Sequence, residues 1–154
     1  MPKEVQGNRN GEGKRFGIVV SRYYESICNN MLDGALGTLR ENGVADDAIT
    51  IASAPGAFEI PAVAKKMVDS GNYDAVITLG CVIRGETSHF DFVAGEAARG
   101  VAQISLDSGC PVLFGVLTTE NREQAVARSE PGEKNKGVEV ALAALEMASL
   151  MGQL

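Results

Sequence analysis

Hydrophobic and polar positions along the chain form alternating blocks, each with the spacing of a strand or of a helix. Four short apolar runs, rich in β-branched residues, have the length of buried strands and cover residues 16–20, 49–54, 74–81 and 112–118. Between and after them, apolar residues recur at helical spacing, which predicts helices over residues 25–42, 62–70, 89–108, 119–129 and 138–151. Gly43 suits the left-handed residue that ends the first helix, and Pro61 suits the start of the second.

This regular alternation of strands with helices predicts an α/β fold. Each strand is followed by a crossover helix, so we expect a four-stranded parallel sheet in the order 2-1-3-4 with helices on both faces, a flavodoxin-like three-layer sandwich. Ligands of such sheets bind beyond the carboxyl ends of the strands. The fold should therefore bring four segments together: Ser21–Tyr24, Ala54–Pro61, Cys81–His89 and Thr118–Asn121.

Residues 1–15 are polar and precede the first strand. We therefore expect an N-terminal arm followed by a single domain over residues 16–154. Within the arm, Glu4–Gly7 could add a short edge strand to a neighbouring subunit. The simpler alternative is a frayed tail, which is common at chain ends.

The composition is that of a globular chain, since 45% of its 154 residues are hydrophobic and 22% are charged. A net charge of −6 argues against binding to nucleic acid, which requires a basic face. There is neither an apolar run long enough for a membrane span nor the apolar core of a signal peptide, so a cytoplasmic location is expected. Cys28, Cys81 and Cys110 lie far apart and are accompanied by one histidine, so we expect reduced, mostly buried thiols and no metal site.

The stretch from residue 80 to residue 100 carries the strongest indication of a binding site. A buried strand leads into a glycine-containing loop, Arg84–Ser88, and then into a helix. Backbone N–H groups at such a helix start lack partners and lie at the positive end of the helix dipole, which suits a phosphate. The candidate cradle consists of the backbone amides of Gly85, Glu86 and Thr87 together with the Thr87 hydroxyl.

Two features of this stretch have simpler alternative explanations. Ser88 and Asp91 have the spacing of a capping box, which would explain the loop without any ligand. His89, the only histidine, lies in the first turn of the helix beside the cradle and is the candidate proton-transfer group. The alternative is a surface histidine without a role.

Other side chains at the predicted ligand end could complete a site. Tyr23 and Phe58 could stack on a flat heterocycle, or they could pack against the core or its rim. Glu59 could accept hydrogen bonds from a ligand, or it could pair with Lys65.

Two cations later in the chain are candidates for binding a phosphate. Arg128 could hold it through its planar fork, or it could simply stabilise the end of its own helix. Lys136 is a weaker candidate of the same kind.

Two common families with this fold do not match the sequence. A phosphoacceptor receiver needs acidic residues after the first strand, and a flavodoxin needs a Ser/Thr-rich phosphate loop there. Residues 21–23 read Ser-Arg-Tyr and fit neither.

Long ordered motifs instead resemble the 6,7-dimethyl-8-ribityllumazine synthase family. The match covers nearly the whole chain and includes RFGIVVSRYY, APGAFEIP, DAVITLGCVIRGETSHFDFV, GVLTTENREQAVARS and NKGVEVALAALEMASL. The resemblance implies a transferase of riboflavin biosynthesis that condenses 5-amino-6-(D-ribitylamino)uracil with 3,4-dihydroxy-2-butanone 4-phosphate to 6,7-dimethyl-8-ribityllumazine, releasing phosphate and water. It also implies imine formation, phosphate elimination and ring closure without a metal or organic cofactor, so that positioning and proton transfer suffice.

The same resemblance assigns roles to individual residues. His89 would move protons, and Tyr23 would stack on the pyrimidine ring. Phe114 and Arg128 would come from an adjacent subunit, to close the ring pocket and to bind phosphate, with Lys136 adding charge. Ala57, Phe58 and Glu59 would line the pyrimidine and ribityl pocket. Backbone contacts to the pyrimidine would come from Cys81, Val82 and Ile83. The phosphate would be held by Glu86 and Thr87.

Three residues depart from the usual pattern of the family. Tyr23 stands where phenylalanine or tryptophan is frequent, which preserves stacking. Cys81 replaces a common threonine, which is compatible with binding through the backbone. Glu86 brings a carboxylate close to the phosphate, so its side chain must point away and its N–H must bind.

The resemblance further implies a homo-oligomer, because the family's site lies between subunits. Members form pentamers, and many assemble twelve pentamers into a hollow, icosahedral sixty-subunit shell. The loop Pro131–Lys136 has no obvious insertion, a feature often seen in shell formers. Riboflavin synthase is an implied partner. The rival hypothesis is a non-catalytic shell protein that binds flavin or lumazine, but the presence of Thr87, His89 and Arg128 favours the enzyme.

Overall fold

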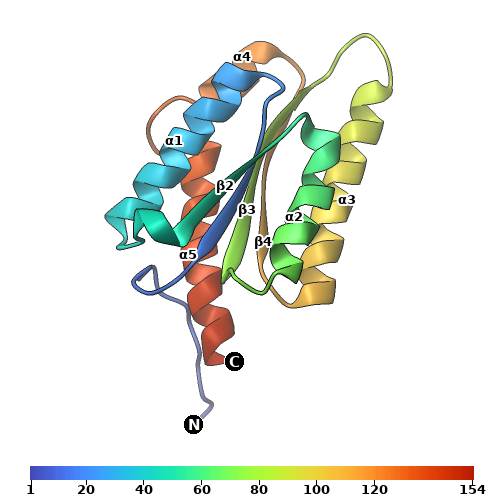
Figure 1. Cartoon of the computed structure of the whole chain (residues 1–154). Coiled ribbons are helices and arrows are strands. Elements are labelled where there is room, and N and C mark those ends of the chain that lie inside the picture. Colours follow the sequence, from blue (N-terminus) through green and yellow to red (C-terminus); the bar gives the residue numbers. More distant parts are fainter.

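The sheet is parallel and has the strand order β2-β1-β3-β4 in the computed structural model, which describes residues 1–154 (Figure 1). Its strands are β1 (Phe16–Ser21), β2 (Ile49–Ala54), β3 (Ala75–Ile83) and β4 (Val112–Thr119). The central strand β1 pairs with both β2 and β3, so that Ile18 lies opposite Ile51 on one side and Ile77 on the other. The predicted strand order is therefore confirmed.

Helices cover both faces of this sheet, as Figure 1 shows, which confirms the predicted three-layer sandwich. One face is covered by α1 (Glu25–Glu41) and α5 (Lys136–Gln153), and the other by α2 (Ile60–Asp69) and α3 (His89–Ser108). The shorter elements are α4 (Arg122–Ala127) and two 3-10 turns, η1 (Asp46–Ala48) and η2 (Ala57–Glu59). None of the helices combines the length and the apolar character that a membrane span requires.

Successive strand residues point into two separate apolar cores. The core under α1 and α5 includes Phe16, Ile18 and Ile77, while the core under α2 and α3 includes Val19 and Val76; all five side chains are wholly buried. Because β1 and β3 are covered on both sides, their sequences read as continuous apolar runs instead of alternating ones.

Most predicted element boundaries lie close to the observed ones, and the differences have local causes. Strand β3 continues to Ile83 because it pairs with β4 as far as Thr119. Helix α4 is shorter than predicted because β4 takes up the first residue of that stretch and Asn121 then caps the helix. Helix α5 begins at Lys136, earlier than predicted, because the side chain of Asn135 caps its first turn.

Part of the N-terminal arm lies along the C-terminal half of α5. The backbone N–H of Asn8 donates to the Ser149 hydroxyl at 3.0 Å, and the side-chain amide of Gln153 donates to the Gln6 carbonyl at 3.0 Å. Glu4–Gly7 forms no strand within the chain, and the first residues extend beyond the body of the molecule (Figure 1). Pairing of this segment with a neighbouring subunit stays a prediction.

Candidate active site

A cavity of about 550 Å³ opens beyond the carboxyl ends of β1 and β3, where the fold predicts a ligand site. Most of its lining is apolar, and it is formed by the segments after β1, β2 and β3 together with the start of α3. We call it the aromatic cavity. Of the residues predicted for the site, it brings together Tyr23, Ala57, Phe58, Glu59, Cys81, Val82, Ile83, Thr87 and His89.

The turn after β1 places the ring of Tyr23 in the open. The Tyr23 N–H donates to the buried Ser21 hydroxyl at 3.1 Å, and Tyr24 has a left-handed backbone with φ of 58°, rare for a residue with a side chain. This tight turn leaves the Tyr23 side chain 63% exposed at the cavity wall, with the Tyr24 ring edge-on at 4.8 Å. The ring of Tyr23 is therefore free to stack on a ligand.

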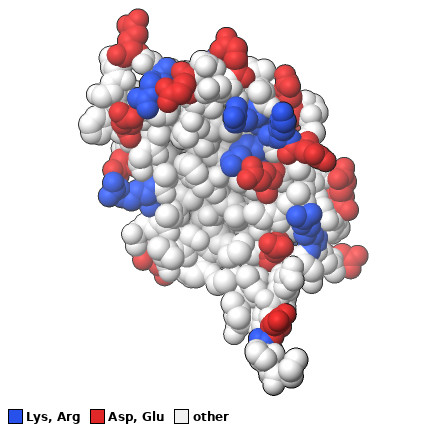
Figure 2. Space-filling model, turned by 180° about the vertical axis from the view of Figure 1, so that it is seen from behind, with Lys and Arg blue, Asp and Glu red and all other residues white.

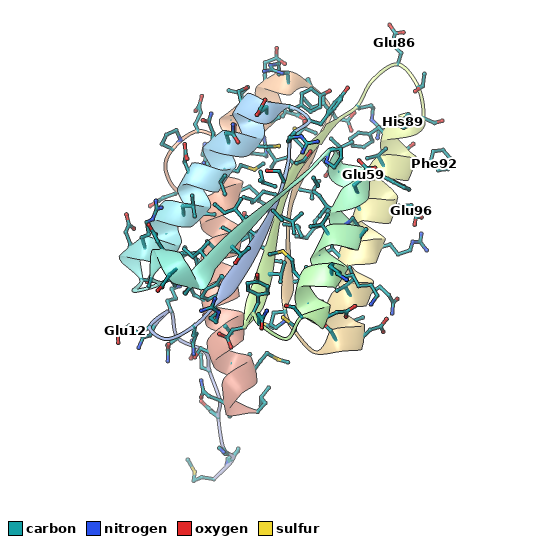
Figure 3. The ribbon with its side chains drawn as sticks, viewed as in Figure 1. Glu12, Glu59, Glu86, His89, Phe92 and Glu96 are labelled. Atoms are coloured by element: carbon teal, nitrogen blue, oxygen red, sulfur yellow. The ribbon has the colours of Figure 1, made fainter.

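The turn η2, after β2, supplies a second aromatic ring and a carboxylate. Phe58 is 56% exposed, whereas Ala57 is buried and anchors the turn in the core under α2 and α3. Glu59 lies at the start of α2 (Figure 3) and also lines the cavity. The alternative pairing of Glu59 with Lys65 does not form, because the Lys65 ammonium contacts Asp69 at 2.6 Å.

The loop between β3 and α3 presents backbone amides without partners. The N–H groups of residues 85–88 and of Phe90 donate to no acceptor of the chain. Gly85 and Thr87 line the cavity, while Glu86 lies at the tip of the loop with its carboxylate directed away from the body (Figure 3). The loop thus has the geometry expected of an anion cradle, and Glu86 can take part only through its backbone.

The capping-box alternative for this loop is wrong. Ser88 occupies the cap position of α3, but its side chain accepts no hydrogen bond from the helix. Asp91 instead forms an ion pair with Arg84 at 3.3 Å. The exposed side chain of His89, the first residue of α3, borders the same cavity beside Gly85 and Thr87.

The thiol of Cys81 belongs to the buried wall of the cavity. Burial raises the pKa of this thiol to about 11, and burial raises that of the neighbouring Cys28 thiol to about 12. Both groups therefore stay protonated near neutral pH, which makes them poor nucleophiles. No three His, Cys, Asp or Glu side chains lie close enough together to hold a metal ion.

Phe114 and Arg128, two of the predicted site residues, do not line the aromatic cavity. They lie in a second cavity of about 520 Å³ between β4, the end of α4 and the start of α5, which also contains Lys134 and Lys136. We call it the cationic cavity. Figure 2 shows basic side chains gathered on this side of the molecule, next to a broad area without charged residues.

The connection between α4 and α5 holds the basic residues of the cationic cavity in place. Asn135 is buried, and its side-chain amide donates to the carbonyls of Ser129 at 2.8 Å and Glu130 at 3.1 Å. The Lys136 N–H donates to the Arg128 carbonyl at 2.8 Å, so the two cations come from adjacent backbone.

The charges in the cationic cavity are only partly neutralised within the chain. The Lys136 ammonium lies 3.1 Å from a Glu139 carboxylate oxygen. The Arg128 guanidinium donates to the Gln124 carbonyl at 3.0 Å and, like Lys134, has no carboxylate partner in the chain. This cavity therefore retains positive charge that can bind an anion.

Several lining residues were missed from the sequence. The aromatic cavity also includes Tyr24, Gly56, Phe90, Phe92 and Val93, and the cationic cavity includes Lys134, whereas Gly85 was predicted as part of the cradle and does line the aromatic cavity. Phe92 could have been found, since it lies three residues after His89 and therefore on the same side of the helix. Arg84 pairs with Glu120, which is distant in sequence, and Asn135 binds backbone carbonyls. No local sequence pattern indicates either interaction.

Comparisons with known proteins agree with this geometry. Residues 13–152 match the family model described as 6,7-dimethyl-8-ribityllumazine synthase. A protein named 6,7-dimethyl-8-ribityllumazine synthase from Desulfatibacillum aliphaticivorans is 51% identical over 153 residues, covering 99% of each chain. Another of that name from Desulfotalea psychrophila is 52% identical over 154 residues, covering 100% of this chain and 99% of its own. The chain therefore belongs to the 6,7-dimethyl-8-ribityllumazine synthase family of enzymes.

Proposed function

We propose that this enzyme of riboflavin biosynthesis condenses 5-amino-6-(D-ribitylamino)uracil with 3,4-dihydroxy-2-butanone 4-phosphate, releasing phosphate and water. The observation that carries the proposal is the aromatic cavity, in which stacking rings, a carboxylate, unpaired amides and the only histidine border one space. Family membership and the two full-length relatives support the same reaction.

The pyrimidine occupies the part of the cavity next to the strands. The exposed ring of Tyr23 stacks on it, since an aromatic face and a flat heterocycle pack well. Residues Cys81–Ile83, at the end of β3, offer backbone groups to the polar edge of the ring. Ala57, Phe58 and Glu59 line the pyrimidine and ribityl side, where Glu59 accepts hydrogen bonds from hydroxyl groups.

The phosphate of the ketone occupies the cradle at the start of α3. Unpaired amides of residues 86–88, the Thr87 hydroxyl and the helix dipole all favour a dianion there. The Glu86 carboxylate does not oppose binding because it points away from the body (Figure 3).

His89 transfers protons between the reacting groups. The amine of the uracil attacks the ketone to form an imine with loss of one water, and phosphate is then eliminated, which leaves a new carbonyl group after tautomerisation. The second nitrogen attacks this carbonyl and closes the ring with loss of a second water. Each step moves a proton at a nitrogen or oxygen near the phosphate end, which the His89 imidazole borders. The rest of the acceleration comes from holding the two substrates in reacting geometry.

The complete site is formed by two chains. Phe114 and Arg128 lie in a cavity that shares no lining residue with the aromatic cavity, so they complete the site of an adjacent subunit, together with Lys136. A head-to-tail contact of this kind generates a ring, here a pentamer, and twelve pentamers would form the shell. The broad uncharged area in Figure 2 supports association, residues 1–15 form an arm that contacts a neighbouring subunit, and riboflavin synthase is the proposed partner.

Incubation of the purified chain with both substrates tests the proposed reaction. We expect lumazine absorbance and fluorescence to appear faster than in a reaction without protein. No product above that background, combined with binding of a flavin or lumazine, would favour the non-catalytic binding protein. Sedimentation of the same sample distinguishes a pentamer from a sixty-subunit shell.

A further inference from the structure

Arg84, the residue that follows β3, contacts four residues from two other parts of the chain. Its backbone N–H donates to the Thr119 carbonyl at 2.9 Å, and its Nε donates to a Glu120 carboxylate oxygen at 2.8 Å. A terminal nitrogen lies 3.3 Å from an Asp91 carboxylate oxygen, and the guanidinium lies 4.4 Å from the centre of the Phe90 ring. One side chain thus contacts the end of β4 and the first turn of α3 at once.

These contacts fix both ends of the cradle loop, which spans residues 85–88. Arg84 precedes the loop, and its partners Phe90 and Asp91 follow it, so the Arg84 side chain links the two ends of the loop. Few other contacts restrain these residues: the His89 N–H approaches the Thr87 hydroxyl at 3.4 Å, and the Asp91 N–H donates to the Ser88 carbonyl at 3.0 Å. The position of the cradle amides therefore depends on Arg84.

Arg84 also changes the electrostatics of the cradle. Asp91 and Glu120 each place a carboxylate beside the loop, and both are mostly exposed. Without a cation between them, two negative charges would oppose a dianion at the cradle. The planar fork of arginine can serve both carboxylates while its face covers the Phe90 ring, whereas an ammonium group cannot do all three.

We propose that Arg84 is a positioning residue for the phosphate end of the site. It orders the cradle loop against β4 and α3, and it neutralises Asp91 and Glu120, without itself contacting the reacting atoms. This inference rests on the proposed function for the identity of the phosphate ligand.

Steady-state kinetics of the Arg84→Gln variant test this role through the two substrates separately. We expect KM for the ketone phosphate to rise about 10-fold, while KM for the uracil and kcat change little. Arg84→Lys should fall between wild type and Arg84→Gln, because it keeps the charge and loses the fork. Adding Glu120→Gln to Arg84→Gln should restore part of the lost affinity by removing one unpaired carboxylate.

Arg40→Gln is the matched control. Arg40 pairs with Asp46 through its Nε at 2.7 Å, and it lies in the last turn of α1, away from the cradle loop. The proposal is overturned if Arg84→Gln behaves like Arg40→Gln, or if it weakens binding of both substrates equally.

Titration calorimetry of inorganic phosphate binding to the whole assembled protein tests the role of Arg84 independently of the proposed reaction. If wild type binds phosphate but makes no lumazine, the reaction fails while the comparison of phosphate affinities still decides the role of Arg84. We expect Arg84→Gln to bind phosphate about 10-fold more weakly than wild type and Arg40→Gln. Equal affinities, or no phosphate binding by wild type, overturn the proposal.

Discussion

The aromatic cavity and the cationic cavity of this chain differ in nearly every property that matters for binding. The aromatic cavity lies at the carboxyl ends of central strands and is lined mainly by apolar side chains, with exposed rings and one histidine. The cationic cavity lies beside the edge strand β4 and contains Arg128, Lys134 and Lys136. Each offers what the other lacks.

This difference indicates how the work of the site is divided. A flat heterocycle needs aromatic faces and backbone groups, while a phosphate dianion needs amides and, for tight binding, cations. The aromatic cavity has the rings and the amides, whereas unneutralised basic charge is found in the cationic cavity. Within one chain the two sets lie in separate cavities. In the site proposed above, a second chain in head-to-tail contact brings them together.

Replacement of His89 by alanine should have the largest effect, because it removes the proposed proton-transfer group of the aromatic cavity and leaves the cationic cavity unchanged. We expect kcat to fall by about 10- to 100-fold, the low end of general acid–base effects, since part of the reaction proceeds without catalysis. Glu86→Gln is the control on the same loop and should leave turnover unchanged, because its side chain points away from the body (Figure 3). Turnover of His89→Ala equal to wild type would remove His89 from the mechanism.

Replacement of Arg128 by alanine tests the cationic cavity in the same way. We expect KM for the ketone phosphate to rise about 10-fold with a smaller change in kcat, as for the loss of a charge-assisted hydrogen bond. Steady-state kinetics with each substrate varied in turn measure this, with Arg40→Ala as the control. An unaltered KM would leave Arg128 with only its bond to the Gln124 carbonyl, which stabilises its own helix.

Two substitutions of Tyr23 distinguish stacking from hydrogen bonding in the aromatic cavity. Tyr23→Leu should raise KM for the uracil by about 3- to 10-fold, because an aliphatic side chain loses the face-to-face contact. Tyr23→Phe keeps the ring and should bind the uracil as wild type does. If both variants weaken binding equally, the hydroxyl and not the ring carries the interaction.

Replacement of Cys81 by serine should have the smallest effect. The thiol is buried in the cavity wall, and burial raises its pKa to about 11, so it remains neutral as the pH rises through the working range. We expect kcat/KM to stay within about twofold and the pH profile between about pH 6 and 9 to be unchanged. A basic limb of the profile that disappears in Cys81→Ser would show that the thiol ionises in the working enzyme.

Much of the fold could be predicted because it depends on local patterns. Apolar runs such as Phe16–Val20 are long enough for a strand buried on both faces, and glycines such as Gly43 stop helices wherever they occur in a left-handed conformation. Given the strand order, ligands are expected beyond the carboxyl ends of the parallel strands. This predicted that Tyr23, Phe58 and Thr87 would lie around one cavity, as they do.

The remainder depends on contacts between residues far apart in the chain. The pairing of Arg84 with Glu120 spans 36 positions, and that of Asn135 with the Asn30 carbonyl spans 105. Nothing in the local sequence distinguishes the real partner of Asp91, which is Arg84, from a capping interaction with Ser88. The prediction that Phe114 and Arg128 lie apart from the other site residues came from the resemblance to a family. Hydrophobic periodicity alone could not have given it.

The most direct test of the two-chain site is to mix two damaged subunits. His89→Ala removes the proton-transfer group of the aromatic cavity and Arg128→Ala removes a cation of the cationic cavity, so each variant alone should be slow at a low concentration of the ketone phosphate. If the chains are unfolded, mixed in equal amounts and refolded together, about a quarter of the sites receive both intact halves, because each half is intact in half of the subunits. We therefore predict recovery of about a quarter of wild-type activity in the mixture. Activity no greater than the average of the two variants would show that each chain forms its site alone and would contradict the account.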